Sequence, residues 1–207
     1  GKNLEKEFSY DRIFDISKEI YRVRASKDET EIDSIRKACR IVSKVSRNIP
    51  GIIKEGMNEL NLKKKIDDLL FEHGSIKPSF DTLVGFGKNS ALAHPPVGKK
   101  RLKKGELILV DLGATHGSGY VSDISRTFVL GKPSFIQKKM YWGVSDAKSY
   151  AEKLLTDSKT LLEVQQKTAK ILQSFPGELT HSIGHSLGLE VHDGMAFGEP
   201  SMIPDNY

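Results

Sequence analysis

Two aspartates interrupt apolar segments that are otherwise typical of buried β-strands. Asp111 lies in segment 107–112, and Asp123 lies in segment 120–130. Burying an ionised carboxylate is costly unless a cation or hydrogen-bond donors compensate its charge. Side chains of the same parity on paired strands share a face of the sheet, so the two carboxylates can converge there. The pattern predicts a site for divalent metal ions, although spacing alone also permits N-caps or hairpin salt bridges with Arg126.

A histidine cluster follows near the end of the chain. Three of the six histidines, His181, His185 and His192, lie within twelve residues. Imidazole is a common metal ligand and titrates near neutral pH, so such a cluster can supply both a ligand and proton donors. Gly184 and Gly188 permit close approach of the backbone in the same stretch. The alternative is one structural histidine and two surface histidines.

The other three histidines lie outside this cluster. His94 stands in a loop before two prolines, seventeen positions ahead of Asp111, and we expect it to join the site. His73 closes a helical pattern, where a cation suits the helix dipole, and His116 lies in a predicted turn. We expect neither of these two to take part in chemistry.

Periodicity predicts the elements that position these residues. Apolar stripes predict helices over 28–50, stopped by Pro50 and Gly51, and over 60–70, ended by His73. Strands are expected over 80–86, 107–112 and 120–130, with residues 117–119 as the turn of a hairpin between the last two. Helices are then expected over 135–155 and 161–175, followed by a strand-like segment from 179. Segments 58–70 and 160–172 match weakly at a spacing of 102, which predicts two similar halves, the second without its closing strands.

Composition restricts the class of protein. The chain has 207 residues, 38% hydrophobic and 29% charged, as expected for one soluble globular domain or slightly more. We expect residues 1–22 to be a linker or the tail of a preceding domain, and 23–207 to form the domain that carries the candidate site. No segment is long and apolar enough to span a membrane, residues 1–10 have no export signal, and there is a single cysteine. We therefore expect a cytoplasmic protein.

Charge is distributed rather than clustered. The net charge is +5, but the basic residues are interleaved with acids, and the run 99–104 is interpreted as a surface turn. We expect neither a nucleic-acid partner nor a membrane partner.

Three motifs in order resemble the pita-bread metallopeptidases, the family of methionine aminopeptidase, aminopeptidase P, prolidase and the metal-free creatinase. The motifs contain, in order, the segments 107–114, 122–128 and 184–193, with 79–82 and 89–94 before them. The resemblance covers about residues 23–193 and is greatest to microbial Xaa-Pro dipeptidase (prolidase) and aminopeptidase P, because the histidine segment has the form His-x-x-x-His-x-x-Gly-x-x-x-His-Asp. It implies an α+β pita-bread fold of two pseudo-symmetric halves, each with two helices and an antiparallel sheet, the second half incomplete.

The resemblance also assigns roles. It implies metal ligation by Asp111, Asp123 and His185, with substrate binding and stabilisation of the tetrahedral intermediate by His94, His181 and His192. The family needs two further glutamates from later strands, and Glu199 comes too soon after the histidines to be one of them. We therefore expect this segment alone to be inactive.

The implied activity is metal-dependent hydrolysis of the Xaa-Pro bond at the N-terminus of dipeptides or short peptides. Two divalent ions are expected, manganese or cobalt, with zinc or iron as other options, in a homodimer. The alternatives are an inactive pita-bread module that binds peptides or proteins, and a methionine aminopeptidase. Two features depart from the family pattern. Asp111 and Asp123 are twelve positions apart, one more than usual, which a longer turn or a bulge could absorb. Ser182 and Ser186 replace glycines that often flank these histidines.

Overall fold

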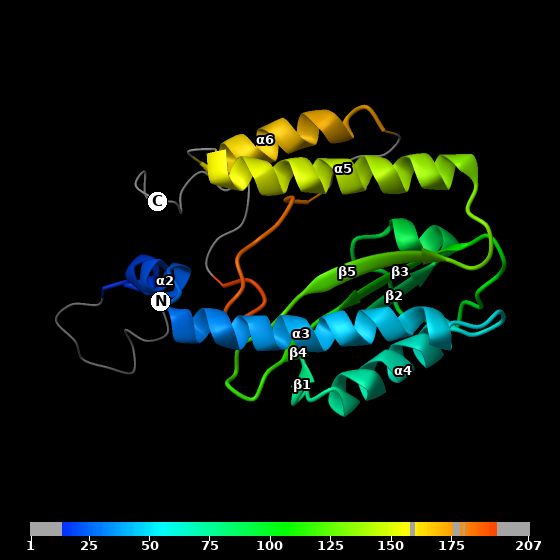
Figure 1. The fold of residues 1–207 in the computed structure, drawn as a ribbon, viewed down its shortest axis with the longest axis horizontal. Helices are drawn as coiled ribbons and strands as arrows, with labels where there is room; N and C mark the ends of the chain where they lie inside the picture. Colours follow the sequence, from blue (N-terminus) through cyan, green and yellow to red (C-terminus); the bar gives the residue numbers. More distant parts are fainter. Residues whose placement is uncertain (1–13, 158–159, 176–178, 180, 194–207) are drawn as a thin grey trace, which may run out of the picture.

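The computed structural model describes residues 14–157, 160–175, 179 and 181–193. In chain order, the elements in this part are α2 (Ser17–Ala25), α3 (Glu29–Ile52), α4 (Glu59–Glu72), β1 (Lys77–Pro78), β2 (Leu83–Phe86), the 3-10 helix η1 (Gly87–Ala91), β3 (Leu107–Leu112), β4 (Ala114–Thr115), β5 (Ile124–Val129), α5 (Phe135–Asp157) and α6 (Leu161–Leu172). Figure 1 shows α5 and α6 above the strands β2, β3 and β5, with α3 and α4 below these three strands.

Helix α3 begins at a reciprocal cap. The side chain of Asp28 accepts a hydrogen bond from Glu31 N, and the side chain of Glu31 accepts one from Asp28 N. The helix does not end at Pro50, as the sequence predicted, but runs on to Ile52. That prediction was wrong because the fixed φ of proline suits a helix, and in the last turn its missing N–H removes only one backbone bond. Helix α4 agrees with the prediction, with Asn58 as its N-cap and His73 as its C-cap.

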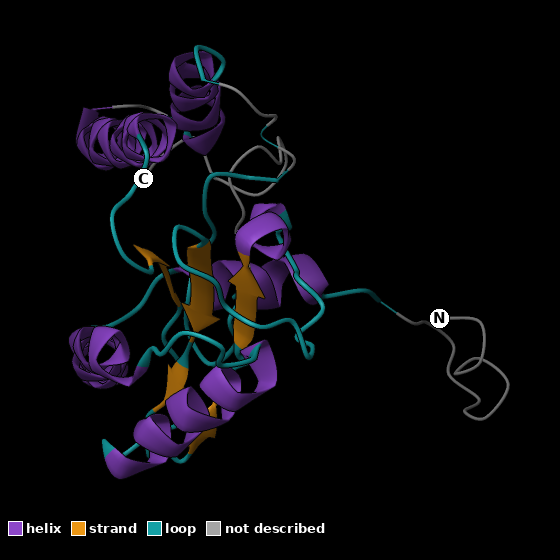
Figure 2. Cartoon of the chain, turned by 90° about the vertical axis from the view of Figure 1, so that its right-hand side faces the viewer, coloured by secondary structure: helices purple, strands orange, loops and turns teal. Residues whose placement is uncertain are grey.

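The main sheet has the order β2-β3-β5, and both pairings are antiparallel. Along β3, buried and half-buried residues alternate, and the buried Ile108, Val110 and Leu112 join the core formed with α3 and α4. Asp111 therefore lies on the face of the sheet that points away from this core. Figure 2 shows the strands between helices on both sides.

The predicted hairpin is confirmed, with β3 paired to β5. Its tip is closed by hydrogen bonds from His116 N to Tyr120 O at 2.9 Å and from Gly119 N to His116 O at 2.8 Å. The register continues unshifted from the Leu112–Ile124 pair to the Thr115–Val121 bridge. The turn at 117–119, and not a bulge, therefore sets the separation of the two aspartates.

Two expected strands are shorter than predicted, β2 beginning at Leu83 and β5 at Ile124. The histidine segment is not strand-like over 181–193, apart from a bridge residue at His185. Hydrogen bonds from Gly188 N to Glu190 O and from Asp193 N to Ser186 O fold this segment back on itself, which prevents an extended strand.

The internal repeat is visible in the helices. The N-caps of α4 and α6, Asn58 and Thr160, are 102 positions apart, and each accepts from the backbone N–H three residues later. Helices α5 and α6 pack together, and Gly143 leaves room for the ring of Phe175, whose atoms would lie 2.3 Å from an added Cβ. Among the described helices, none combines the length and apolar composition needed to span a bilayer. The proposed division near residue 22 falls inside α2 and stays a prediction.

Candidate metal centre

Asp111 and Asp123 are neighbours on the face of the hairpin that points away from the core. Asp111 is paired directly with Ser125, whose hydroxyl donates to Asp111 Oδ1 at 2.7 Å. Asp123 precedes Ser125 by two positions and so shares its side of the sheet. Burial raises the pKa of the Asp111 carboxyl; the Ser125 hydrogen bond opposes this, and the charge of Asp123 raises the pKa further. Two neighbouring carboxylates on a half-buried surface create a negative potential that a cation would relieve.

His185 approaches Asp123 from the histidine segment. Its Nε2 lies 3.2 Å from Asp123 Oδ2, and both side chains are 21% exposed. Its Nδ1 faces the carbonyl oxygen of Ser186 at 3.2 Å. The hydrogen bond with Asp123 is the main reason that the pKa of His185 is raised. A backbone carbonyl on Nδ1 orients the ring so that Nε2 is presented to the carboxylates, which is the usual arrangement of a metal-binding histidine.

His192 and His94 lie close to this group. The rings of His185 and His192 are 4.0 Å apart between centroids, tilted by 37°. Partial burial and the charge of His185 lower the pKa of His192. His94 is exposed, and its charge influences the pKa of both Asp111 and His192. Asp123, His185 and His192 are therefore linked by pairwise contacts, and Asp111 and His94 lie near enough for their charges to interact.

His181 is the exception. It is exposed, and its Nδ1 contacts the carbonyl oxygen of the adjacent Ser182 at 2.6 Å. Its predicted role in substrate binding stays a prediction.

The donor types fit a divalent cation, because carboxylate and imidazole both bind manganese, cobalt, zinc and iron. The described residues do not, however, form a complete coordination sphere. Across residues 14–157, 160–175, 179 and 181–193, no three His, Cys, Asp or Glu side chains come together closely enough to hold a metal ion.

The histidine segment is attached to the rest of the molecule through Asp193, a residue to which the sequence analysis gave no role. Asp193 is 3% exposed, and its Oδ2 accepts from Leu189 N at 3.0 Å. Its Oδ1 lies 2.7 Å from Arg24 Nε of α2, an ion pair without hydrogen-bond geometry. Val121 N donates to Gly188 O at 2.9 Å and so joins the segment to the hairpin. The acid directly after His192 was the one signal in the sequence that could have indicated this anchor.

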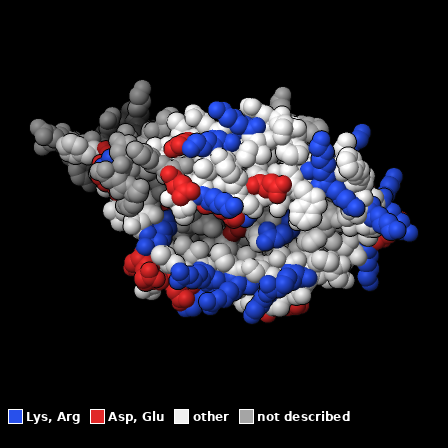
Figure 3. Space-filling model, turned by 45° about the horizontal axis from the view of Figure 1, so that its top comes forward, with Lys and Arg blue, Asp and Glu red and all other residues white. Residues whose placement is uncertain are grey.

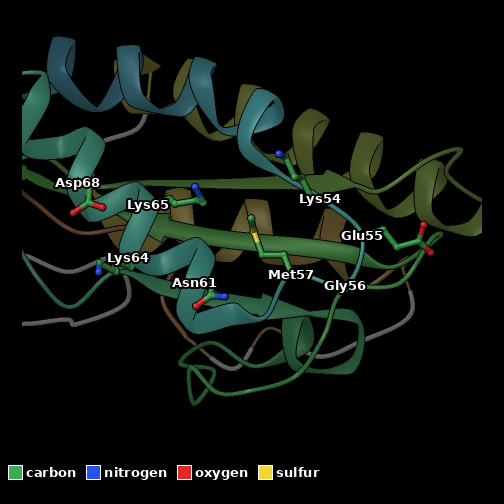
Figure 4. Close-up of a pocket in the computed structure, with 8 residues that line it drawn as sticks. All are labelled: Lys54, Glu55, Gly56, Met57, Asn61, Lys64, Lys65 and Asp68. Carbon is green, nitrogen blue, oxygen red and sulfur yellow. The ribbon is translucent and has the colours of Figure 1, made fainter.

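The surface shows two further features. On the face in Figure 3, Lys and Arg side chains border a central hollow, with Asp and Glu among them. A separate pocket of about 560 Å³ lies beside the start of α4 (Figure 4) and includes none of the predicted site residues; its lining is Lys54, Glu55, Gly56, Met57, Asn61, Lys64, Lys65 and Asp68. Its lysines are exposed and are accompanied by two acids, which is typical of a solvated surface.

Comparison with known proteins gives a consistent result. The sequence pattern of metallopeptidase family M24 matches residues 33–206. The Xaa-Pro dipeptidase of Pyrococcus furiosus is 35% identical over 194 residues, which are 93% of this chain and 54% of that protein. The chain thus spans about half the length of the curated relatives that it matches.

Solved structures show the same relationship. The prolidase from Pyrococcus furiosus superposes with a TM-score of 0.86 at 29% identity, over 98% of this chain and 61% of that one. The X-Pro aminopeptidase from Thermotoga maritima superposes with a TM-score of 0.85 at 28% identity, over 98% of this chain and 58% of that one. The pita-bread α+β fold expected from the sequence is confirmed.

Proposed function

This chain belongs to metallopeptidase family M24, and from that premise we propose that the whole protein hydrolyses the Xaa-Pro bond at the N-terminus of dipeptides or short peptides. The observation that carries the proposal is the contact of His185 with Asp123 beside Asp111, whose pKa both residues influence. The similarity to an Xaa-Pro dipeptidase supports the substrate class.

We assign the metal-binding role to Asp111, Asp123 and His185. Two divalent ions, manganese or cobalt, would supply the Lewis acid and the activated water of a metal-assisted hydrolysis. The two carboxylates would provide negative charge, and the Nδ1 contact with Ser186 would hold His185 with Nε2 directed at them. Two further glutamate ligands would come from the part of the protein that this chain does not include. The 207-residue chain on its own would then be inactive.

The remaining histidines would act on the substrate. His192 lies beside His185, and partial burial lowers its pKa, which favours the neutral ring. Its ring N–H would donate a hydrogen bond to the developing oxyanion. His94, in the loop before Pro95, would hold the scissile amide. His181 would contact the substrate from the rim.

The test uses purified full-length protein after treatment with a chelator and reloading with manganese or cobalt. Hydrolysis of an Xaa-Pro dipeptide, lost with the chelator and restored by metal, is the expected result, with little turnover of the matched Xaa-Ala dipeptide. Release of N-terminal methionine from a Met-Ala peptide instead would make the protein a methionine aminopeptidase. Stable metal-free protein that binds peptides without cleaving them would make it an inactive module.

We also propose how the chain fits into the whole protein. Residues 1–22 would connect a preceding domain to a catalytic domain that begins at residue 23, and the protein would be a cytoplasmic homodimer. Light scattering on the full-length protein checks the dimer, because a monomeric mass would contradict it.

A further inference from the structure

A buried carboxylate lies at the first residue of α4, far in sequence from the candidate metal centre. Glu59 is 0% exposed, although glutamate is seldom fully buried. Its Oε1 accepts hydrogen bonds from Phe86 N at 2.9 Å and Asn89 Nδ2 at 2.8 Å, and its Oε2 accepts from Gly98 N at 3.0 Å. Three donors and the N-terminal end of a helix together compensate the buried charge.

These donors mark the two ends of one loop. Phe86 ends β2, Asn89 belongs to η1, and Gly98 comes four residues after His94. The backbone of α4 holds the same far end, because Leu60 N donates to Gly98 O at 3.1 Å and Glu59 N donates to Lys100 O at 3.2 Å. A single side chain therefore clamps the start and the end of the loop that carries His94.

A second contact reinforces the clamp. Lys100 Nζ donates to Phe86 O at 2.5 Å and lies 3.5 Å from Glu106 Oε1. Both backbone groups of Phe86 are thus engaged by side chains, its N–H by Glu59 and its carbonyl by Lys100. Within the loop, His94 itself is exposed. The position of its ring therefore depends on how the loop is held at its ends.

Replacement of Glu59 by its isostere Gln would not preserve the clamp. Each carboxylate oxygen of Glu59 accepts at least one N–H, so an amide NH₂ at either position would face a donor. The donors are buried or half-buried backbone and side-chain groups. Leaving any of them without a hydrogen bond therefore costs folding free energy.

We propose that Glu59 is a positioning residue, which fixes the His94 loop over the face of the hairpin that carries Asp111. This inference rests on the proposed peptidase function for its catalytic consequence. It predicts that Glu59 acts on turnover only through His94 and leaves the metal ligands unaffected, because none of its hydrogen bonds reaches Asp111, Asp123 or His185.

The test is a double-mutant cycle in the full-length enzyme. Glu59→Gln is expected to lower kcat on an Xaa-Pro dipeptide by about 10- to 100-fold, the scale of a small misplacement of a substrate-contacting group. In the His94→Ala background, the same change should lower kcat by less than about twofold. Metal content should stay at the wild-type level. Glu72→Gln, the same substitution at the exposed end of the same helix, is the matched control and should behave as wild type.

A second measurement keeps the proposal testable without activity. Amide hydrogen exchange over residues 86–98 should accelerate in Glu59→Gln and not in Glu72→Gln. Asn89→Ala, which removes one of the three hydrogen bonds, gives a milder variant that should shift both readouts in the same direction if Glu59→Gln fails to fold.

The outcomes separate the two proposals. Full-length wild-type protein without Xaa-Pro hydrolysis would refute the proposed function, and exchange over 86–98 would then decide by itself whether Glu59 holds the loop. Equal losses of kcat from Glu59→Gln in the wild-type and His94→Ala backgrounds, lost metal, or unchanged exchange over 86–98 would each overturn the positioning role.

Discussion

Gly188→Ala should release the histidine segment from its anchor. A Cβ added at Gly188 would lie 1.7 Å from Asp193 Oδ2 and 2.7 Å from its Cγ. The Asp193 side chain cannot simply rotate away from the added Cβ, because its carboxylate is held by Leu189 N and by Arg24 Nε. The carboxylate must therefore move, and the loop that positions His185 and His192 must move with it.

The size of the expected destabilisation follows from the contacts of Asp193 that the added methyl group displaces. Overpacking a tight contact costs about 1–3 kcal/mol, and losing a hydrogen bond to a charged, buried carboxylate costs about 1.5–3 kcal/mol. The ion pair between Arg24 and Asp193 contributes less to the free energy of unfolding, because the Arg24 side chain is 28% exposed and its charge is partly screened by water. These contributions overlap, so we expect the free energy of unfolding to fall by about 3 kcal/mol.

Urea unfolding of the full-length protein measures this change, with Gly117→Ala as the matched control. An added Cβ at Gly117, in the exposed hairpin turn, meets no atom within 4 Å. The affinity for manganese should fall in Gly188→Ala and not in Gly117→Ala. If the two variants agree in unfolding free energy to within about 0.5 kcal/mol, the anchoring role of Asp193 is refuted.

Three further predictions concern the frame around the site. Asp28→Ala removes the cap of α3 and should lower the free energy of unfolding by about 1 kcal/mol. Asp33→Ala removes an exposed pair with Lys37 and should leave the free energy of unfolding close to the wild-type value; equal losses in the two variants would contradict the capping role. Leu62→Ala, at a fully buried position of α4, should lower the free energy of unfolding by about 2–5 kcal/mol. Leu60→Ala, at a position that is 43% exposed, should lower it clearly less, and chemical denaturation of both variants measures the difference. The hydrogen bond to Glu31 raises the pKa of Tyr120 to about 12, so the stability from this bond is complete below the ordinary tyrosine value of 10.0 and is lost as the pH rises towards 12; spectroscopic titration should show one late-ionising tyrosine that Glu31→Gln returns towards 10.0, and no change in that variant would refute the assignment.

The hairpin could be predicted from local pattern. Residues 107–112 alternate between the core and the opposite face, so the parity of Asp111 and Asp123 follows from the sequence once the turn at 117–119 is recognised. The halves were also predictable, because the same cap and helix recur 102 positions apart.

The anchors of the site could not be predicted in the same way. Arg24 and Asp193 come from opposite ends of the described chain, and Glu59 reaches Phe86 and Gly98 only after the sheet has formed. Such contacts leave no periodic signal. The segment from residue 179 was expected to be strand-like, but the hydrogen bonds of Gly188 and Asp193 fold it into a loop.

The metal-binding role of Asp123 is central to the proposed function, and metal content measured with turnover on the same samples tests this role directly. Full-length Asp123→Ala should lose its metal and its Xaa-Pro hydrolysis together. His192→Ala should keep its metal while its rate falls by about two to three orders of magnitude, the usual cost of one oxyanion donor. An Asp123→Ala protein that retains wild-type metal content would contradict the metal centre proposed at this hairpin.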